Sequence, residues 1–255
     1  MSHWYDTKGT PCYEVEGKNG LRPSTLRDAR KHGWVPSVST IWNDVVSRPM
    51  LNKWTQTELM KALWDASFSA DNLGVEGGFQ EFEKVARNKF NEKQQIVMNR
   101  GTTIHDHLEK YFKGEDTPRE HMFLCDSVAR MLDVRCGTNN DWIAEKSFAH
   151  SSGYGGKVDL HSDEWVVDFK TKDFPPKPNV KKMVYDDYGT QLAAYGQGLG
   201  GGRRLLNLFI DVKSVAIMEW EHTDVNRFQD MFNHALALWK LVKKYEPSFI
   251  DRRIL

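Results

Sequence analysis

Two acidic residues and a lysine lie close together in the segment GGKVDLHSDEWVVDFKT, which reads as two short strands. Side chains alternate between the faces of a strand, so Asp168 and Lys170 share one face. A turn at Asp163 and Glu164 would place Asp159 opposite Asp168, with β-carbons roughly 4.5 to 5.5 Å apart. Facing carboxylates repel each other, and a divalent cation relieves that repulsion. Hard oxygen ligands suit Mg²⁺ or Mn²⁺ better than Zn²⁺, so the spacing predicts such a metal site with an ammonium group beside it.

His105 lies on a predicted helix, in the segment RGTTIHDHLEKYF. Helical spacing aligns His105 with Leu108 and Phe112, at the border of the buried face. It is therefore either a histidine satisfied in the core or a ligand near that border. His105 and His107 form an HxH pair, but residues two apart on a helix do not face each other, which argues against a joint metal site.

Three further polar residues are spaced so that they could serve the same site. Glu145 lies in the predicted strand WIAEKSF, either as another carboxylate for the face of Asp159 and Asp168 or as an exposed strand residue. Gln191 and Tyr195 are four residues apart in YGTQLAAYGQ and stack on one helix face. They can bond a phosphate or orient a lysine, or Tyr195 can simply pack in the core.

Basic side chains gather in three places: in KPNVKK, which ends in Lys181 and Lys182, at Arg203 with Arg204, and at Lys243 with Lys244. Each patch is either a nucleic-acid contact or an ordinary solvated surface. Lys plus Arg and Asp plus Glu number 35 each. A nucleic-acid partner would therefore be held by local patches and not by net charge.

Apolar spacing and turn formers predict the elements that position these groups. Residues 1–36 read as mostly irregular. We expect a helix that is capped by Ser37 or Ser39 and ends by Pro49. We expect further helices over 25–32, 50–68, 76–100, 103–113, 119–135, 187–196 and 224–245, and strands over 142–149, 156–161, 165–171, 204–212 and 214–220. The order predicts an α/β fold, a small mixed central sheet flanked by helices. We expect a mainly helical N-terminal region over 1–100, packed on a core over 101–255.

The cysteines and the apolar runs of the sequence predict the cellular compartment of the protein. The three cysteines, Cys12, Cys125 and Cys136, are odd in number and widely spaced, which indicates a reducing compartment and no disulfide framework. The N-terminus lacks a signal pattern, and no apolar run approaches about 18 residues. We therefore expect a cytoplasmic protein without a membrane partner.

Signatures of other enzyme classes are missing from the sequence. The stretch GQGLGG matches a dinucleotide fingerprint on paper, but it ends a predicted helix and leads into a strand, the reverse of the order that the fingerprint needs. We interpret it as a helix stop and turn. The sequence has no HExxH, P-loop or GxSxG motif, so zincin, NTPase and α/β-hydrolase interpretations lack support.

Several motifs follow one another in a recognisable order: VPSVSTIW, then GTTIHDHLE, GKVD, DFK and QLAAY. The last four resemble the GxxxH helix, GxxD strand, DxK and QxxxY motifs of the PD-(D/E)xK nuclease superfamily. Within it the chain is similar to the RecB-like branch, which includes phage exonucleases and the mitochondrial genome maintenance exonuclease. The first segment resembles the PSVTxI segment of phage and mitochondrial members. The likeness covers roughly residues 35–200, and its strength lies in order and spacing.

This resemblance implies a restriction-endonuclease-like core and a Mg²⁺- or Mn²⁺-dependent deoxyribonuclease. It also implies DNA as the partner, with a recombination or single-strand-binding protein as a further partner, in the cytoplasm or in a host's cytoplasm for a viral chain. Some members hold an iron-sulfur cluster, but three scattered cysteines cannot supply four thiolates. By resemblance, the metal ligands are His105, Asp159, Asp168 and the carbonyl of Phe169, with Glu145 less certain. The resemblance also implies that Lys170 positions or deprotonates water. It implies that Gln191 and Tyr195 contact Lys170 or the DNA backbone.

Hydrolysis of a phosphodiester requires charge neutralisation on the phosphate and a nucleophile made from water, and a carboxylate-held Mg²⁺ supplies both. The leading hypothesis is a DNA exonuclease. An endonuclease of the same fold, a non-catalytic nucleic-acid-binding module and an unrelated metallohydrolase of small substrates are the alternatives.

Overall fold

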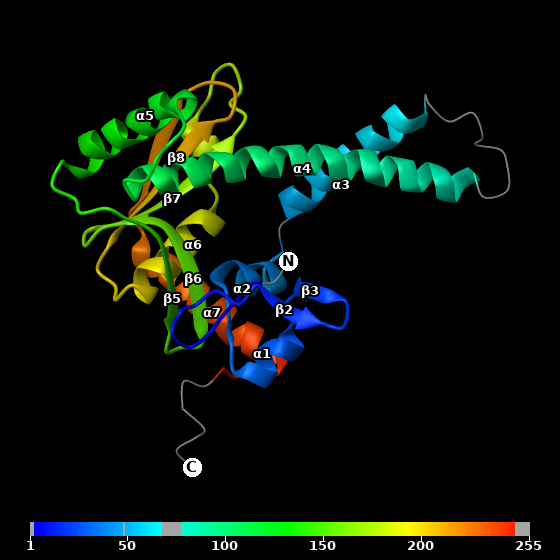
Figure 1. The fold of residues 1–255 in the computed structure, drawn as a ribbon, viewed down its shortest axis with the longest axis horizontal. Helices are drawn as coiled ribbons and strands as arrows, with labels where there is room; N and C mark the ends of the chain where they lie inside the picture. Colours follow the sequence, from blue (N-terminus) through cyan, green and yellow to red (C-terminus); the bar gives the residue numbers. More distant parts are fainter. Residues whose placement is uncertain (1–2, 48, 68–77, 248–255) are drawn as a thin grey trace, which may run out of the picture. The chain divides into compact units, whose positions relative to one another are not determined.

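The computed structural model describes residues 3–47, 49–67 and 78–247 (Figure 1). The strands are β1 (Trp4–Tyr5), β2 (Glu14–Gly17), β3 (Gly20–Pro23), β4 (Val35–Pro36), β5 (Ile143–His150), β6 (Tyr154–His161), β7 (Trp165–Lys172), β8 (Arg204–Asp211) and β9 (Ile217–His222). The helices are α1 (Leu26–His32), α2 (Val38–Val45), α3 (Pro49–Ser67), α4 (Gly78–Phe112), α5 (Arg119–Cys136), α6 (Asp186–Gly198) and α7 (Val225–Lys243), with the short 3-10 helix η1 (Val180–Lys182). The predicted α/β class is confirmed.

The main sheet has five strands in the order β5-β6-β7-β8-β9. β7 and β8 run parallel, whereas the other neighbours are antiparallel. A parallel pair needs a crossover connection, and here η1 and α6 form it between β7 and β8. This connection brings α6 back onto the sheet, where it contacts β6, β7 and β8.

The two faces of β7 meet different helices. The Lys170 ammonium contacts Gln191 on α6, whereas the ring of Phe169, one residue earlier, packs edge-on against His105 and is stacked with Phe112, both on α4. This follows from the alternation of side chains along a strand. Asp168 and Lys170 thus share the α6 side of the strand.

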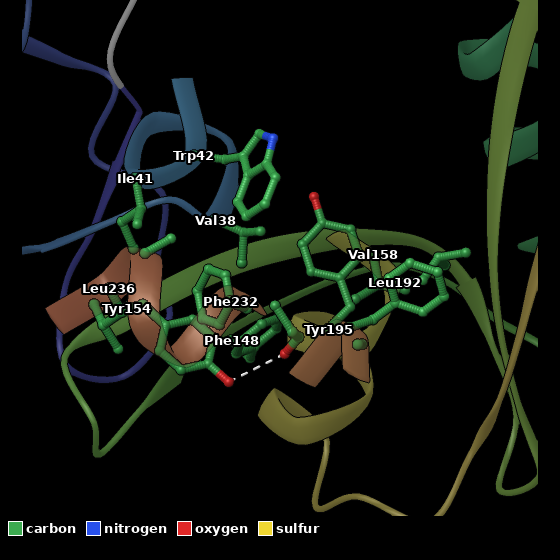
Figure 2. Packing of buried hydrophobic residues seen from close by; sticks show 14 of the residues in the cluster. Val38, Ile41, Trp42, Phe148, Tyr154, Val158, Leu192, Tyr195, Phe232 and Leu236 are labelled. Carbon is green, nitrogen blue, oxygen red and sulfur yellow. Dashed lines mark hydrogen bonds between the residues drawn. The ribbon is translucent and has the colours of Figure 1, made fainter. Parts of the chain in front are cut away.

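Aromatic and aliphatic side chains form a core between the sheet, α2, α6 and α7, and Figure 2 shows part of it. Phe148 and Tyr154 pack edge to face, and Tyr154 packs in the same way on Phe232 of α7. The Tyr154 hydroxyl donates to the carbonyl of Ala194, 3.1 Å away, so its polar end is satisfied within the core. This contact joins β6 to α6, the helix that carries Gln191 and Tyr195.

The chain divides by contacts into two units, Met1–Val46 with His105–Leu255, and Ser47–Ile104. The sequence analysis expected a region over 1–100 packed on a core over 101–255. The first 46 residues contribute to the core of the later part, because Trp4, Val38 and Trp42 are buried in it. All candidate site residues lie in the first unit.

Helix α4 runs without interruption from Gly78 to Phe112. The sequence analysis expected two helices, with a break at Gly101, so that expectation is wrong; its start at Glu76 lies outside the described residues. A glycine inside a helix costs only about 1 kcal/mol relative to alanine, which a long helix can absorb. The N-terminal part, expected to be mostly irregular, contains two short strand pairs. In the described ranges, we find no helix with the length and apolarity needed to cross a membrane.

Candidate active site

Asp168 and Lys170 form a largely buried ion pair in the middle of β7. The Lys170 ammonium lies 2.8 and 2.7 Å from the two oxygens of Asp168. The Asp168 side chain is 5% exposed and that of Lys170 is 21% exposed, so the pair is largely shielded from water but can be reached at the ammonium end. The same ammonium donates to Oε1 of Gln191 at 3.1 Å.

Gln191 and Tyr195 extend this network along α6. Gln191 donates through Nε2 to the Tyr195 hydroxyl, 2.9 Å away, while its carbonyl oxygen accepts from Lys170. Tyr195 packs edge-on against Phe148 and is almost fully buried, and burial raises its pKa well above the ordinary value. The neutral tyrosine therefore holds the glutamine amide in one orientation, and the amide in turn holds Lys170.

Gly156 makes room for Tyr195. A β-carbon at Gly156 would lie 2.7 Å from Cε1 of Tyr195 and 3.0 Å from Cε1 of Phe148, which is too close for either ring to stay in place. Gly156 begins the GKVD segment that the sequence analysis singled out, and Tyr195 ends the QLAAY segment. The two motifs are thus coupled by packing.

Asp159 interrupts the pairing of β6 with β7. The ladder contains Leu160 opposite Val167 and His161 opposite Val166, a register whose next step would pair Asp159 with Asp168. At that step, Oδ2 of Asp159 accepts the backbone N–H of Phe169 at 2.8 Å, so a side chain replaces the strand carbonyl as acceptor. The Asp159 carboxylate therefore lies at the point where the two strands part.

His105 lies beside this carboxylate, with its Nδ1 3.5 Å from Oδ2 of Asp159. Burial lowers the pKa of His105, but the hydrogen bond and the charge of Asp159 outweigh burial and raise it above the ordinary value. Conversely, burial raises the pKa of Asp159, but His105 and Lys170 outweigh burial and hold it below the ordinary value. Asp159 is therefore ionised near neutral pH.

The pKa of Asp168 moves in the other direction. Burial raises it, and the nearby Asp159 carboxylate adds to this against the opposing charge of Lys170. Two carboxylates with different environments therefore lie next to each other at one point of the sheet. A cation bound at this point is stabilised by the negative charge of both carboxylates.

The Glu145 side chain on β5 is 8% exposed and forms an ion pair with Lys157. Burial raises the pKa of Glu145 above its ordinary value in spite of this lysine, and Asp159 adds to the rise. Its backbone has φ of 55°, in the left-handed region that a non-glycine strand residue rarely adopts. Glu145 interrupts the β5–β6 ladder between the pairs Ala144–Leu160 and Lys146–Val158. The register of these pairs places Glu145 opposite Asp159.

Two buried polar residues that the sequence analysis missed support Asp168 from the neighbouring strands. Asn207 on β8 donates through Nδ2 to Oδ2 of Asp168 at 2.6 Å, and its Oδ1 lies 2.8 Å from Nε2 of His222 on β9. Because that amide oxygen can only accept, the His222 ring carries its proton on Nε2. The one signal in the sequence was a lone asparagine in the apolar strand RLLNLFID.

The predicted DNA-binding residues lie in two kinds of environment. Arg203 donates to the carbonyls of Ser162, Leu199 and Gly201, and Arg204 pairs with Glu221, so both guanidinium groups are engaged within the protein. By contrast, Lys181 and Lys182 lie exposed on η1.

The oxygen donors of this site match the preferences of Mg²⁺ or Mn²⁺. In the part of the chain that the structure describes, no three or more His, Cys, Asp and Glu side chains converge closely enough to form a metal-binding group by themselves. Mg²⁺ does not need such a group, because it usually keeps several waters and binds one or two carboxylates together with substrate phosphates. The carboxylates of Asp159 and Asp168 are donors of the kind that Mg²⁺ takes. Zn²⁺, which takes three or four protein ligands, fits less well.

Comparison with known proteins gives distant likenesses only. No protein-family model matches the chain, and no curated protein matches it. The solved structures that are similar in part include these two. The first, the structure of SSO0001, has 15% sequence identity and a TM-score of 0.27, and the match covers 44% of this chain and 55% of that one. The second, an alkaline exonuclease (LHK-Exo) from Laribacter hongkongensis, has 14% identity and a TM-score of 0.32, with 56% of this chain and 81% of that chain covered.

Proposed function

We propose that this protein is a metal-dependent DNA exonuclease that hydrolyses phosphodiester bonds. The observation that carries the proposal is the Lys170 ammonium, held between the Asp168 carboxylate and the Gln191 amide beside the ionised Asp159. A lysine placed in this way next to two carboxylates suits the attack of water on a phosphate. The ordered motifs of the sequence support the same class.

The residues divide the work of the reaction. A metal bound at Asp159, Asp168 and the carbonyl of Phe169 would neutralise the phosphate and lower the pKa of water. Lys170 holds the attacking water through its ammonium group or, as the neutral amine, takes a proton from that water at Nζ, while Gln191 fixes the position of this nitrogen. His105 keeps Asp159 ionised and oriented.

The resemblance of the sequence motifs also suggests the biological setting. We place the activity in DNA recombination in the cytoplasm, with a recombination or single-strand-binding protein as the partner. This part of the proposal depends on the motifs alone.

The test is an assay of end-labelled linear DNA with Mg²⁺ and the purified protein. We expect release of labelled nucleotides by the wild type and at least about a 100-fold loss with Asp168→Asn. Asp186→Asn is the matched control, because Asp186 is an exposed carboxylate paired with Arg227. Equal degradation by wild type and Asp168→Asn would remove this site from the reaction.

The same preparation separates the alternatives. Cutting of covalently closed circular DNA would identify an endonuclease. Tight DNA binding without Mg²⁺-dependent cleavage would identify a non-catalytic module. Turnover of small phosphoesters, but not of DNA, would identify a metallohydrolase of small substrates.

A further inference from the structure

Lys172 lies on β7, two residues after Lys170, and alternation places both on the same side of the strand. Both ammonium groups lie 5.1 Å from the centroid of the Tyr188 ring. The two cations are therefore neighbours, with one aromatic ring shared between them.

The Lys172 ammonium contacts a main-chain carbonyl oxygen and aromatic rings. It donates to the carbonyl of Met183 at 2.9 Å and lies 4.9 Å from the ring of Tyr185 and 5.4 Å from that of Phe209. Rings stabilise a cation through their π faces, but more weakly than a carboxylate does. Burial, together with the charge of Lys170, lowers the pKa of Lys172 to about 8.

Other partly buried lysines of this unit have carboxylate partners. Lys170 pairs with Asp168, Lys240 with Glu246, and Lys243 with Asp44. The residue opposite Lys172 in the ladder is Asp211, but its two oxygens accept from the N–H of Phe174 and the hydroxyl of Ser214. For Lys172, no carboxylate of the described residues lies within ion-pair distance. A half-buried cation without a counterion is costly, so this position suits an anion that arrives from outside.

We propose that Lys172 binds the phosphate next to the scissile phosphate of a nucleic-acid strand. The inference rests on the proposed function, because Lys170 marks the scissile position. Residues two apart on a strand are separated by roughly 6.6 Å, which is close to the spacing of successive phosphates in an extended nucleic-acid strand. A lysine ammonium is a compact point charge that suits a phosphate oxygen. Lys181 and Lys182, exposed just before Met183, extend the same basic path.

The direct test combines Lys172→Met with a chemically altered DNA. Binding of short oligonucleotides is measured with EDTA present, so that no cleavage occurs. In each oligonucleotide, one phosphate near the end is replaced by a neutral methylphosphonate. For unmodified DNA, we expect Lys172→Met to weaken binding about tenfold and to lower the salt slope by about 0.7 to 0.9, the value for one phosphate contact.

With the methylphosphonate at one position, the affinity of the wild type should fall to about that of Lys172→Met for unmodified DNA. The same modification should not lower the affinity of Lys172→Met any further. Equal losses for both proteins at every position would overturn the proposal. Lys240→Met removes a lysine that is 20% exposed and carboxylate-paired, and it should leave binding unchanged.

Thermal unfolding separates binding from a structural role. Removal of a buried, unpaired charge should leave the melting temperature of Lys172→Met unchanged or raise it. A less stable variant that binds DNA as tightly as the wild type would overturn the proposal. DNA binding that depends on Lys172, without Mg²⁺-dependent cleavage, would support the phosphate site and refute the exonuclease. Normal cleavage with no effect of Lys172→Met on binding would support the exonuclease and refute the phosphate site.

Discussion

Asn207 and Asp168 face each other across the parallel pair β7–β8, and the asparagine amide lies 2.6 Å from a carboxylate oxygen. The same amide nitrogen also lies 3.2 Å from the main-chain carbonyl of Asp168. Asn207 is fully buried and Asp168 is 3% exposed. The carboxylate is therefore held from the neighbouring strand on one side and by Lys170 on the other.

Asn207→Leu should impair the active site more than it impairs the fold. The variant leaves the N–H of His222 without a partner and one carboxylate oxygen of Asp168 with Lys170 as its remaining partner, which should cost about 1 to 3 kcal/mol of unfolding free energy. Loss of the orienting bond should lower DNA cleavage by about 10- to 100-fold. The measurements are chemical denaturation and initial cleavage rates.

Leu132→Ala is the matched control for Asn207→Leu, because Leu132 is fully buried in α5. It should lose comparable stability and keep its activity. If both variants keep full activity at a temperature at which they are folded, Asn207 does not position Asp168.

His222 predicts a pH dependence of stability. Burial lowers the pKa of His222 from 6.5 to about 4, so between these pH values His222 binds a proton in the unfolded chain but stays neutral in the folded chain. Protonation of His222 therefore does not affect the unfolding free energy above pH 6.5 and decreases it by about 3 kcal/mol as the pH falls to about 4. His222→Gln keeps a donor for Asn207 but cannot titrate. Its unfolding free energy, measured by denaturation from pH 7 to 4, should fall by about 3 kcal/mol less than that of the wild type; identical pH curves would contradict this.

Gly156→Ala should disturb the site through Tyr195. The added methyl group would lie 2.7 Å from the Tyr195 ring, so the ring must move and release Gln191. We expect a loss of about 1 to 3 kcal/mol in stability and a fall in cleavage rate. Gly196→Ala is the control, because its methyl group would be 3.5 Å from the nearest atom, on Leu205, and alanine favours the helix. Full activity of Gly156→Ala would show that the tyrosine position does not matter.

Mg²⁺ should bind without any substrate and stabilise the folded protein. Addition of Mg²⁺ or Mn²⁺ should raise the melting temperature of the wild type, because a ligand of the native state shifts unfolding by mass action. Asp159→Asn should abolish most of this rise, whereas Asp186→Asn should retain it. A rise of the same size in Asp159→Asn would place the ion elsewhere.

Local patterns in the sequence predicted the elements and part of the site, and the structure explains where they fell short. Strand alternation placed Asp168 with Lys170, and helical spacing placed Gln191 with Tyr195, because both relationships are set within one element. Asn207 and His222 were missed because their proximity to Asp168 depends on the order β7-β8-β9, which no short pattern encodes. The positive φ of Glu145 and the part played by residues 1–46 in the core likewise depend on contacts between distant segments.

The most direct test of the account is the single-turnover rate of nucleotide release from end-labelled DNA in Mg²⁺, compared between Lys170→Met and Lys240→Met. Both variants lose one partly buried, carboxylate-paired lysine, but only Lys170 lies between Asp168 and Gln191. We predict a fall of at least about 100-fold for Lys170→Met and no change for Lys240→Met. Equal rates for the two variants would contradict the assignment of the active site.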